Sequence, residues 1–236
     1  MSSRTKEGFV ADFLREGILS GQFPRGQRLK QAEIAAQLDI SITPVREALR
    51  LLAAEGYVLG ITHRGALVAP FEAAAAAEVI ELRAQLESQI TLAAMRRITL
   101  GEMEKLRSFA DDFESAAKRA DVNGTRAANY RLHRFVYTLA DQPQTAHFLQ
   151  ILWAKYPFDL IGRIDGRIIR AAREHTEILD AMLARDADAA REATRRHVYA
   201  GWEELQRQLA ARPADAGDAH GAQPQQDKSA DGDAMQ

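Results

Sequence analysis

The chain has 236 residues, of which 46% are hydrophobic, with no cysteine and a formal net charge of −2. The lack of cysteine excludes disulfides and thiolate metal sites, so any metal would take histidine, carboxylate or amide ligands. No apolar run is long enough to cross a membrane, and no export signal is visible at the start, so we expect a cytoplasmic protein with no membrane partner.

An amphipathic helix is expected at the start of the chain and ends at Gly21 and Pro24. Its apolar positions, which we expect to be buried, are Phe9, Val10, Phe13, Leu14 and Ile18. A second, shorter helix follows over residues 31–38, and residues 39–41 form a connection short enough for a helix-turn-helix.

The third helix is expected to begin within residues 41–50, Ser-Ile-Thr-Pro-Val-Arg-Glu-Ala-Leu-Arg. Thr43 is expected to cap this helix by accepting a hydrogen bond from an unpaired backbone amide. Pro44 suits the first helical position, and Glu47 would lie in the positively polarised first turn. These signals predict a well-defined helix start.

The two faces of this third helix differ in polarity. The apolar face is made by Val45, Ala48, Leu49 and Leu52. The other face presents Thr43, Arg46 and Arg50. Such a helix docks with one side and can enter a DNA groove with the other.

After the third helix, residues 57–59 and 66–68 are predicted to form two short strands, joined by a turn at residues 63–65. Together with the helices they indicate a winged helix-turn-helix. The apolar spacing alone leaves an alternative open, because a three-helix unit with no role in DNA binding would show the same pattern.

The charge of the N-terminal part is only slightly basic. Residues 1–70 hold nine Lys or Arg against seven Asp or Glu, whereas residues 213–236 hold five Asp and one Lys. Phosphate contacts would therefore depend on the placement of single cations. The candidates are Arg28, Lys30, Arg46, Arg50 and Arg64, with His63 beside them at the wing turn.

The N-terminal part resembles the DNA-binding domain of GntR-family transcription regulators. The residues that carry the resemblance are Ile18 to Gly21, Pro24, Gly26, Leu29, Ser41 to Leu49, Glu55 to Val58, Arg64 and Gly65. The resemblance implies operator DNA as a partner, with contacts from Thr43, Arg46 and the wing, Gly65 included. Two positions depart from the family pattern: Asp39 stands where many relatives have Gly, and Ile42 where many have a DNA-contacting Arg.

The region from residue 72 to residue 212 has an almost purely helical pattern, and we expect an all-α bundle. Turn signals divide it into six helices, over residues 73–98, 100–120, 123–140, 143–163, 166–185 and 187–211. We therefore expect three regions: a DNA-binding domain over residues 1–71, a helical sensing domain over residues 72–212, and a disordered polar tail over residues 213–236.

Three helices of the bundle carry a histidine at a position that is expected to face inward. His133 lies one turn after Asn129, His175 lies in an apolar stripe, and His197 lies among small residues. Imidazoles that share one interior space would suit a divalent transition metal, with open positions for a small carboxylate. Each histidine taken alone is also compatible with an ordinary core residue that is hydrogen-bonded to a backbone carbonyl or to water.

Residues 72–212 resemble the FCD ligand-sensing domain of one GntR branch, and the six-helix count resembles its VanR-like subgroup. The segments that carry the resemblance are Glu81 to Arg83 with Glu87, Asn129 to His133, Glu174 to Leu179, and Asp186 to His197. The resemblance implies a divalent metal, Zn²⁺ first and Ni, Mn or Fe as other possibilities. Its implied ligands are Asn129, His133, His175 and His197, with Asn in place of the more frequent Asp.

Arg83 is a further candidate site residue, because a helical wheel places it on the inward arc of its helix. A buried guanidinium needs an anionic partner. That partner is either Glu87, one turn later, or the carboxylate of a bound metabolite.

These patterns favour a homodimeric transcription regulator, most simply a repressor, with a small organic acid as its effector. The competing hypothesis is a helical-bundle metalloenzyme fused to a nucleic-acid-binding module. The chain has no His-Glu-x-x-His, no Glu-x-x-His pair and no glycine-rich phosphate loop, so we expect no enzyme activity. A purely architectural DNA-binding protein, a third hypothesis, would not need buried histidines.

Overall fold

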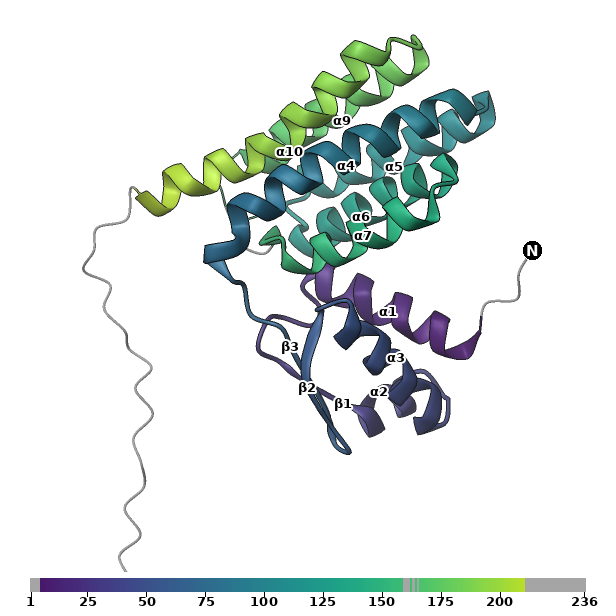
Figure 1. Cartoon of the computed structure of the whole chain (residues 1–236), viewed down its shortest axis with the longest axis vertical. Helices are drawn as coiled ribbons and strands as arrows, with labels where there is room; N and C mark the ends of the chain where they lie inside the picture. The colour runs from purple at the N-terminus through teal and green to yellow at the C-terminus, as the bar shows by residue number, and fades with distance from the viewer. Residues whose placement is uncertain (1–4, 159–161, 163, 165, 211–236) are drawn as a thin grey trace, which may run out of the picture.

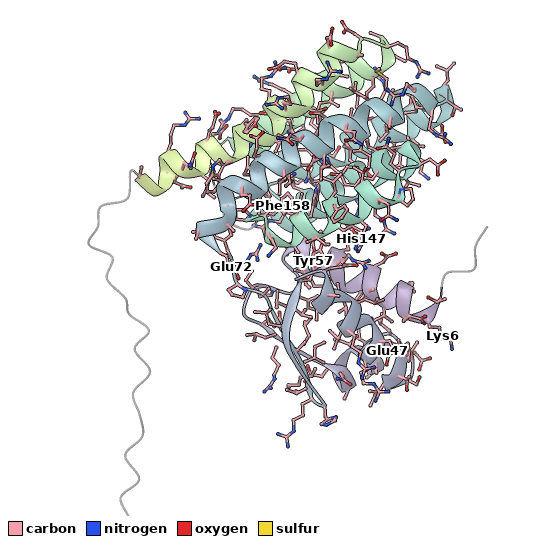
Figure 2. All side chains as sticks on the ribbon, in the orientation of Figure 1. Lys6, Glu47, Tyr57, Glu72, His147 and Phe158 are labelled. Carbon is pink, nitrogen blue, oxygen red and sulfur yellow. The ribbon has the colours of Figure 1, made fainter. Side chains whose placement is uncertain are left out.

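The structure is a computed structural model that describes residues 5–158, 162, 164 and 166–210. Figure 1 shows a helical bundle lying on a smaller unit of helices and a sheet, with the two joined by a short link at Glu72 that Figure 2 labels. The expected tail over residues 213–236 lies outside the described residues. None of the described helices is long and apolar enough to cross a membrane.

The smaller unit is a winged helix-turn-helix, as expected. Its elements are α1 (Lys6–Ser20), β1 (Arg28–Lys30), α2 (Gln31–Gln37), α3 (Ile42–Ala54), β2 (Val58–Thr62) and β3 (Gly65–Val68). The three strands form one antiparallel sheet in the order β1-β3-β2. Strand β1 was not expected from the sequence, because three residues are too few to show an alternating pattern.

The start of α3 differs from the expectation in three respects. The helix begins at Ile42 with Ser41 as its N-cap residue, and no side chain caps it. Thr43 and Pro44 are therefore its second and third residues, and the predicted Thr43 cap was wrong. Pro44 is still tolerated, because the backbone amides of a first helical turn have no partner within the helix. Glu47 lies beyond the first turn, which contains no acidic residue.

The turn before α3 contains a residue in the left-handed region. Asp39 adopts a left-handed conformation, with φ of 51°, at the position where many relatives have Gly. Aspartate tolerates this conformation better than most residues because its short polar side chain can bond locally. The departure from the family pattern therefore leaves the connection between α2 and α3 intact.

The buried face of α1 differs from the predicted face at one edge. Val10 and Leu14 are fully buried as expected, but Phe9 is 50% exposed. The helix also buries Arg15, whose Nε and Nη2 donate to the carboxylate of Glu55 at 2.6 and 2.8 Å. This ion pair joins α1 to the end of α3 inside the core of the unit.

The bundle contains η1 (Ala73–Ala75), α4 (Ala76–Arg97), α5 (Leu100–Lys118), α6 (Val122–Ala140), α7 (Pro143–Lys155), α9 (Arg167–Leu183) and α10 (Ala187–Ala210). The predicted helix boundaries agree closely except at one helix. The helix predicted over residues 143–163 ends at Lys155, and Tyr156 is extended. A reciprocal capping box between Thr99 and Glu102 shows why α5 begins where it does.

Helix α6 connects the two units directly. Its residues Arg134 and Arg131 bind Asp12 and Glu16 of α1 at 2.8 and 3.3 Å. On the other side of the junction, the Tyr57 hydroxyl donates to the carbonyl of Gln150 at 3.0 Å, where Figure 2 labels Tyr57 directly below the bundle. The DNA-binding unit is therefore held against α6 and α7 by charged and polar contacts.

The sheet generates a first testable prediction. Gly65 has φ of 138°, and a Cβ atom there would lie 1.9 Å from the carbonyl oxygen of Leu29. We expect Gly65→Ala to destabilise the protein by at least about 2 kcal/mol, because it combines backbone strain with a clash against β1. Chemical unfolding measures this change.

The matched control for that change is Gly60→Ala. Gly60 also has a positive φ, of 59°, but open space surrounds the position of its Cβ. Its substitution should cost about 1 kcal/mol from strain alone. Equal losses of stability for the two variants would contradict the clash with Leu29.

Candidate functional site

The side chains expected to meet DNA lie on the surface of the winged helix-turn-helix, with one exception. The exposed set is Arg28, Thr43, Arg46, Arg50, His63 and Arg64. They come from β1, from α3 and from the turn between β2 and β3. Gly65 is buried, so its part in this surface is to let the wing backbone pass close to Leu29.

Glu47 gives the recognition face of α3 a partner of opposite charge. Its carboxylate accepts a hydrogen bond from Nη1 of Arg50 at 2.9 Å, and Nε of Arg46 lies 3.5 Å away. All three side chains are at least 40% exposed, so these pairs contribute little to stability. Their effect is local: one carboxylate oxygen of Glu47 lies within reach of both arginines on the outer face of α3.

The three histidines from α6, α9 and α10 converge in the interior of the bundle. His133, His175 and His197 each offer one ring nitrogen, and these nitrogens lie within 4.8 Å of one another. His175 and His197 come from the neighbouring helices α9 and α10, His133 comes from α6, and all three side chains are buried. The expectation of one shared interior space is therefore confirmed for the three imidazoles.

Hydrogen bonding inside this cluster is incomplete. Both ring nitrogens of His175 and Nε2 of His133 are buried without a hydrogen-bond partner among the described residues. A buried polar atom without a partner costs on the order of 1–3 kcal/mol. A core histidine would normally be paired, so the arrangement fits a divalent cation bound by Nε2 of His133 and by the one nitrogen of His175 that carries a lone pair.

The local environment keeps two of these rings in their neutral form. Burial lowers the pKa of His175 far below its usual value, and the neighbouring His197 and His133 lower it further. Burial also lowers the pKa of His197, although Glu174 partly opposes that shift. A neutral imidazole has a free lone pair, which is the form that binds a metal.

One buried and one partly buried arginine–glutamate pair flank the histidines. Arg83 and Glu87 on α4 form an ion pair at 2.7 Å with side chains 3% and 1% exposed. Arg167 and Glu174 on α9 form a second pair, with Nη1 donating to Oε1 at 2.6 Å. Glu87 is therefore the partner of Arg83 in this structure, in agreement with one of the two alternatives left open by the sequence.

The Arg83–Glu87 pair lies among aromatic rings. The guanidinium of Arg83 lies 4.0 Å from the ring centre of Tyr156, and the indole Nε1 of Trp153 donates to Glu87 at 3.2 Å. Burial would raise the pKa of Glu87, but Arg83 and then His133 hold that pKa well below its usual range. The carboxylate therefore stays charged in the interior.

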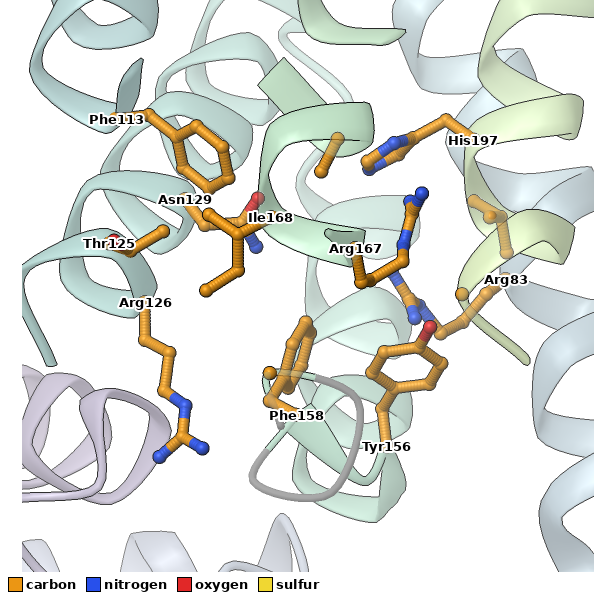
Figure 3. Close-up of a pocket in the computed structure, with 14 residues that line it drawn as sticks. Arg83, Phe113, Thr125, Arg126, Asn129, Tyr156, Phe158, Arg167, Ile168 and His197 are labelled. Carbon is orange, nitrogen blue, oxygen red and sulfur yellow. The ribbon is translucent and has the colours of Figure 1, made fainter. Parts of the chain in front are cut away.

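A cavity of about 70 Å³ adjoins the histidine cluster. Figure 3 shows Arg83, Arg167 and His197 on one side of it, Phe113 and Asn129 on the other, and Phe158 below. The volume is enough for several water-sized groups. The cavity therefore combines one imidazole, guanidinium groups and an apolar wall, which is the lining that a small organic anion requires.

Asn129, the fourth ligand implied by the resemblance, lines this cavity and is only partly buried. It lies one turn before His133 on α6, so the two side chains share a face. The described structure brings the three histidines together and places Asn129 on the adjoining wall.

Two site residues have roles that sequence reasoning missed. Arg167 was given none, and Glu174 appeared only as part of a motif. They are seven residues apart on α9, a spacing that returns to the same face of a helix after two turns. That spacing was a usable signal, although it gave no indication that the pair would be buried.

Comparisons with known proteins agree with this architecture. The model of bacterial regulatory proteins of the gntR family matches residues 6–68, and that of the FCD domain matches residues 78–200. The "Probable D-xylose utilization operon transcriptional repressor" of Paenarthrobacter nicotinovorans is 31% identical, over 81% of this chain and 84% of its own length. The regulator YdhC of Bacillus subtilis is 28% identical over 83% of this chain and 89% of its own length.

A solved structure of Escherichia coli McbR/YncC has the same fold. Its TM-score is 0.75 at 21% identity, and the match covers 87% of this chain and 99% of that chain. The chain is thus a bacterial DNA-binding transcription regulator built from a winged helix-turn-helix and a helical domain, not an enzyme. It belongs to the GntR family, in the branch that carries an FCD domain.

The buried pair on α4 generates a second prediction. We expect Arg83→Met to lower the free energy of unfolding by about 3–5 kcal/mol, because it leaves the Glu87 carboxylate buried without its main partner. Denaturant unfolding measures the loss.

Lys118→Met is the control for this substitution, since Lys118 pairs with Glu114 at the surface with side chains 72% and 52% exposed. That change should stay within about 0.5 kcal/mol. A similarly small effect of Arg83→Met would show that Glu87 does not depend on Arg83.

Proposed function

We propose that this regulator is a homodimeric repressor whose hold on its operator responds to a small organic acid bound beside a divalent metal in the FCD domain. Three imidazoles that are buried together without enough hydrogen-bond partners carry this proposal. The proposal includes membership of the VanR-like subgroup, which the six-helix pattern predicted from the sequence favours. The described division of the fold also supports a DNA-binding domain over residues 1–71 and a sensing domain over residues 72–212.

The proposed metal ligands are His133, His175 and His197, with Asn129 as the fourth. This set of nitrogen and amide donors, without thiolate, suits Zn²⁺ and is also compatible with Ni, Mn or Fe. A bound divalent cation supplies open coordination positions and positive charge for a carboxylate.

The charges around the cavity explain why a metal would matter for the effector. Arg83 and Arg167 line the cavity, but each is already paired with a glutamate, Glu87 and Glu174 respectively. An entering carboxylate would therefore meet two cations whose charge is largely cancelled. The small cavity volume favours an organic acid of few atoms.

Helix α6 offers a physical route from the sensing site to DNA. It carries His133 toward the cluster, and Arg131 and Arg134 toward α1 of the DNA-binding unit. An effector that fits one arrangement of α6 better than another would shift the position of that unit. In a dimer, such shifts change the separation of two recognition helices, which must match half-sites about one helical turn of DNA apart.

Arg46 provides a test of the DNA-binding surface. We expect Arg46→Ala to weaken binding to an operator selected from random-sequence DNA by about 1–3 kcal/mol, because an exposed arginine on α3 would lose its contact with a base edge. A mobility-shift titration measures the affinity.

Arg173→Ala is the control for that experiment, because Arg173 is exposed on α9 in the bundle. Its operator affinity should match that of the unaltered protein. An unchanged affinity of the Arg46→Ala variant would rule out the outer face of α3 as the reader of the operator.

His175 provides a test of the metal site. We expect His175→Ala to abolish tight binding of Zn²⁺ in equilibrium dialysis, because this ring is buried at the centre of the cluster. His147→Ala, which removes an exposed histidine of α7, should bind Zn²⁺ as the unaltered protein does.

A thermal-shift screen against small carboxylates tests the effector. Stabilisation should appear with Zn²⁺ and disappear with a chelator, and it grows with the logarithm of ligand excess. Full retention of Zn²⁺ by the His175→Ala variant would contradict the metal site. Stabilisation that survives the chelator would contradict a metal-dependent effector.

A further inference from the structure

Glu174 makes a contact that the binding site described so far does not use. Its Oε2 atom lies 2.7 Å from Nδ1 of His197, although the two residues belong to different helices. Glu174 directly precedes His175 on α9. Helix α9 therefore contributes one ring of the cluster, His175, and an acceptor for another ring, His197.

This contact determines which nitrogen of His197 is available. A carboxylate can only accept hydrogen bonds, so Nδ1 of His197 must carry the hydrogen and donate it. The other ring nitrogen, Nε2, then has a free lone pair. The ring is thereby fixed in the tautomer whose lone pair lies on the side of Nε2.

Arg167 in turn fixes Glu174. Its two terminal nitrogens donate to the two carboxylate oxygens in a bidentate pair, and its side chain is only 4% exposed. The carboxylate is therefore held in one orientation by two parallel hydrogen bonds from a guanidinium group.

We propose that Glu174 is a positioning residue for the metal, which orients His197 through Nδ1 while Arg167 holds its carboxylate in place. This inference rests on the proposed metal site, because it assigns a role to a residue that does not itself bind the ion. Carboxylates that accept a hydrogen bond from a metal-binding histidine fix the ring and raise its basicity.

Glu87 is less suited to the same role at His133. Its Oε2 atom is 3.4 Å from Nδ1 of His133, and its other oxygen accepts from both Arg83 and Trp153. The longer contact gives less control over the ring. The cluster is therefore asymmetric, with His197 the more firmly oriented of the two rings.

The test is a metal titration of Glu174→Gln in the full chain. The amide has one acceptor oxygen where the carboxylate has two, so it cannot serve both Arg167 and His197 in the same way. We expect Zn²⁺ affinity, measured by competition with a chromophoric chelator, to fall by about 10- to 100-fold. The absorption spectrum of the Co²⁺-loaded variant should change as well, because the geometry of the His197 ligand is altered.

Glu204→Gln is the matched control. Glu204 also pairs with Arg167, at 3.6 Å, and with Arg170, but it forms no ion pair with a histidine among the described residues. The same loss of charge beside the same arginine should leave Zn²⁺ affinity within about threefold. Thermal unfolding of the metal-free proteins checks that each variant is folded, and Glu174→Asp, which withdraws the carboxylate by one methylene, replaces the glutamine variant if it is not.

The possible outcomes separate the two proposals. Equal Zn²⁺ affinity of Glu174→Gln and the unaltered protein overturns the positioning role and leaves the metal site standing. An equal loss in Glu204→Gln also overturns it, because the effect would then follow from charge near Arg167. If the unaltered protein binds no divalent metal, both the proposed site and this inference fall.

Discussion

The interior of the FCD domain is organised by the cost of burying nitrogen atoms. Three imidazoles and two guanidinium groups lie out of contact with water, and each needs either a hydrogen-bond acceptor or a cation. Glu87 pairs with Arg83, although Nη1 of Arg83 still has no hydrogen-bond partner among the described residues, and Glu174 pairs with Arg167 and with one nitrogen of His197. Ring nitrogens of the three histidines lie close together, and too few acceptors surround them. This shortage of acceptors is what favours a bound cation.

Much of the architecture could be predicted from the sequence because it follows from local periodicity. The spacing of apolar residues gave the helices of both units, and the positions of His133, His175 and His197 on inward faces indicated one shared interior. The hairpin of the wing was equally visible. These features depend on short stretches of chain, in which the spacing of residues indicates the secondary structure of that stretch.

The features that escaped prediction depend on contacts between elements. Strand β1 is defined by its pairing with β3. Phe9 is exposed because the face of α1 that packs on the core does not include it. The unused cap at Thr43 shows that a suitable residue does not set a helix start when another residue, here Ser41 two positions earlier, takes the N-cap position. The bond between Glu174 and His197 joins two helices, and no spacing within one helix could reveal it.

Helix α6 contacts two parts of the protein: one face carries His133 of the histidine cluster, and another carries Arg131 and Arg134, which form ion pairs with α1. When a rigid helix rotates about its axis, the residues on both of its faces move together. A tilt of α6 at His133 would also move Arg131 and Arg134, which pair with Glu16 and Asp12 of α1. In the proposed mechanism, α6 therefore links the sensing site to the DNA-binding unit without a separate transmission element.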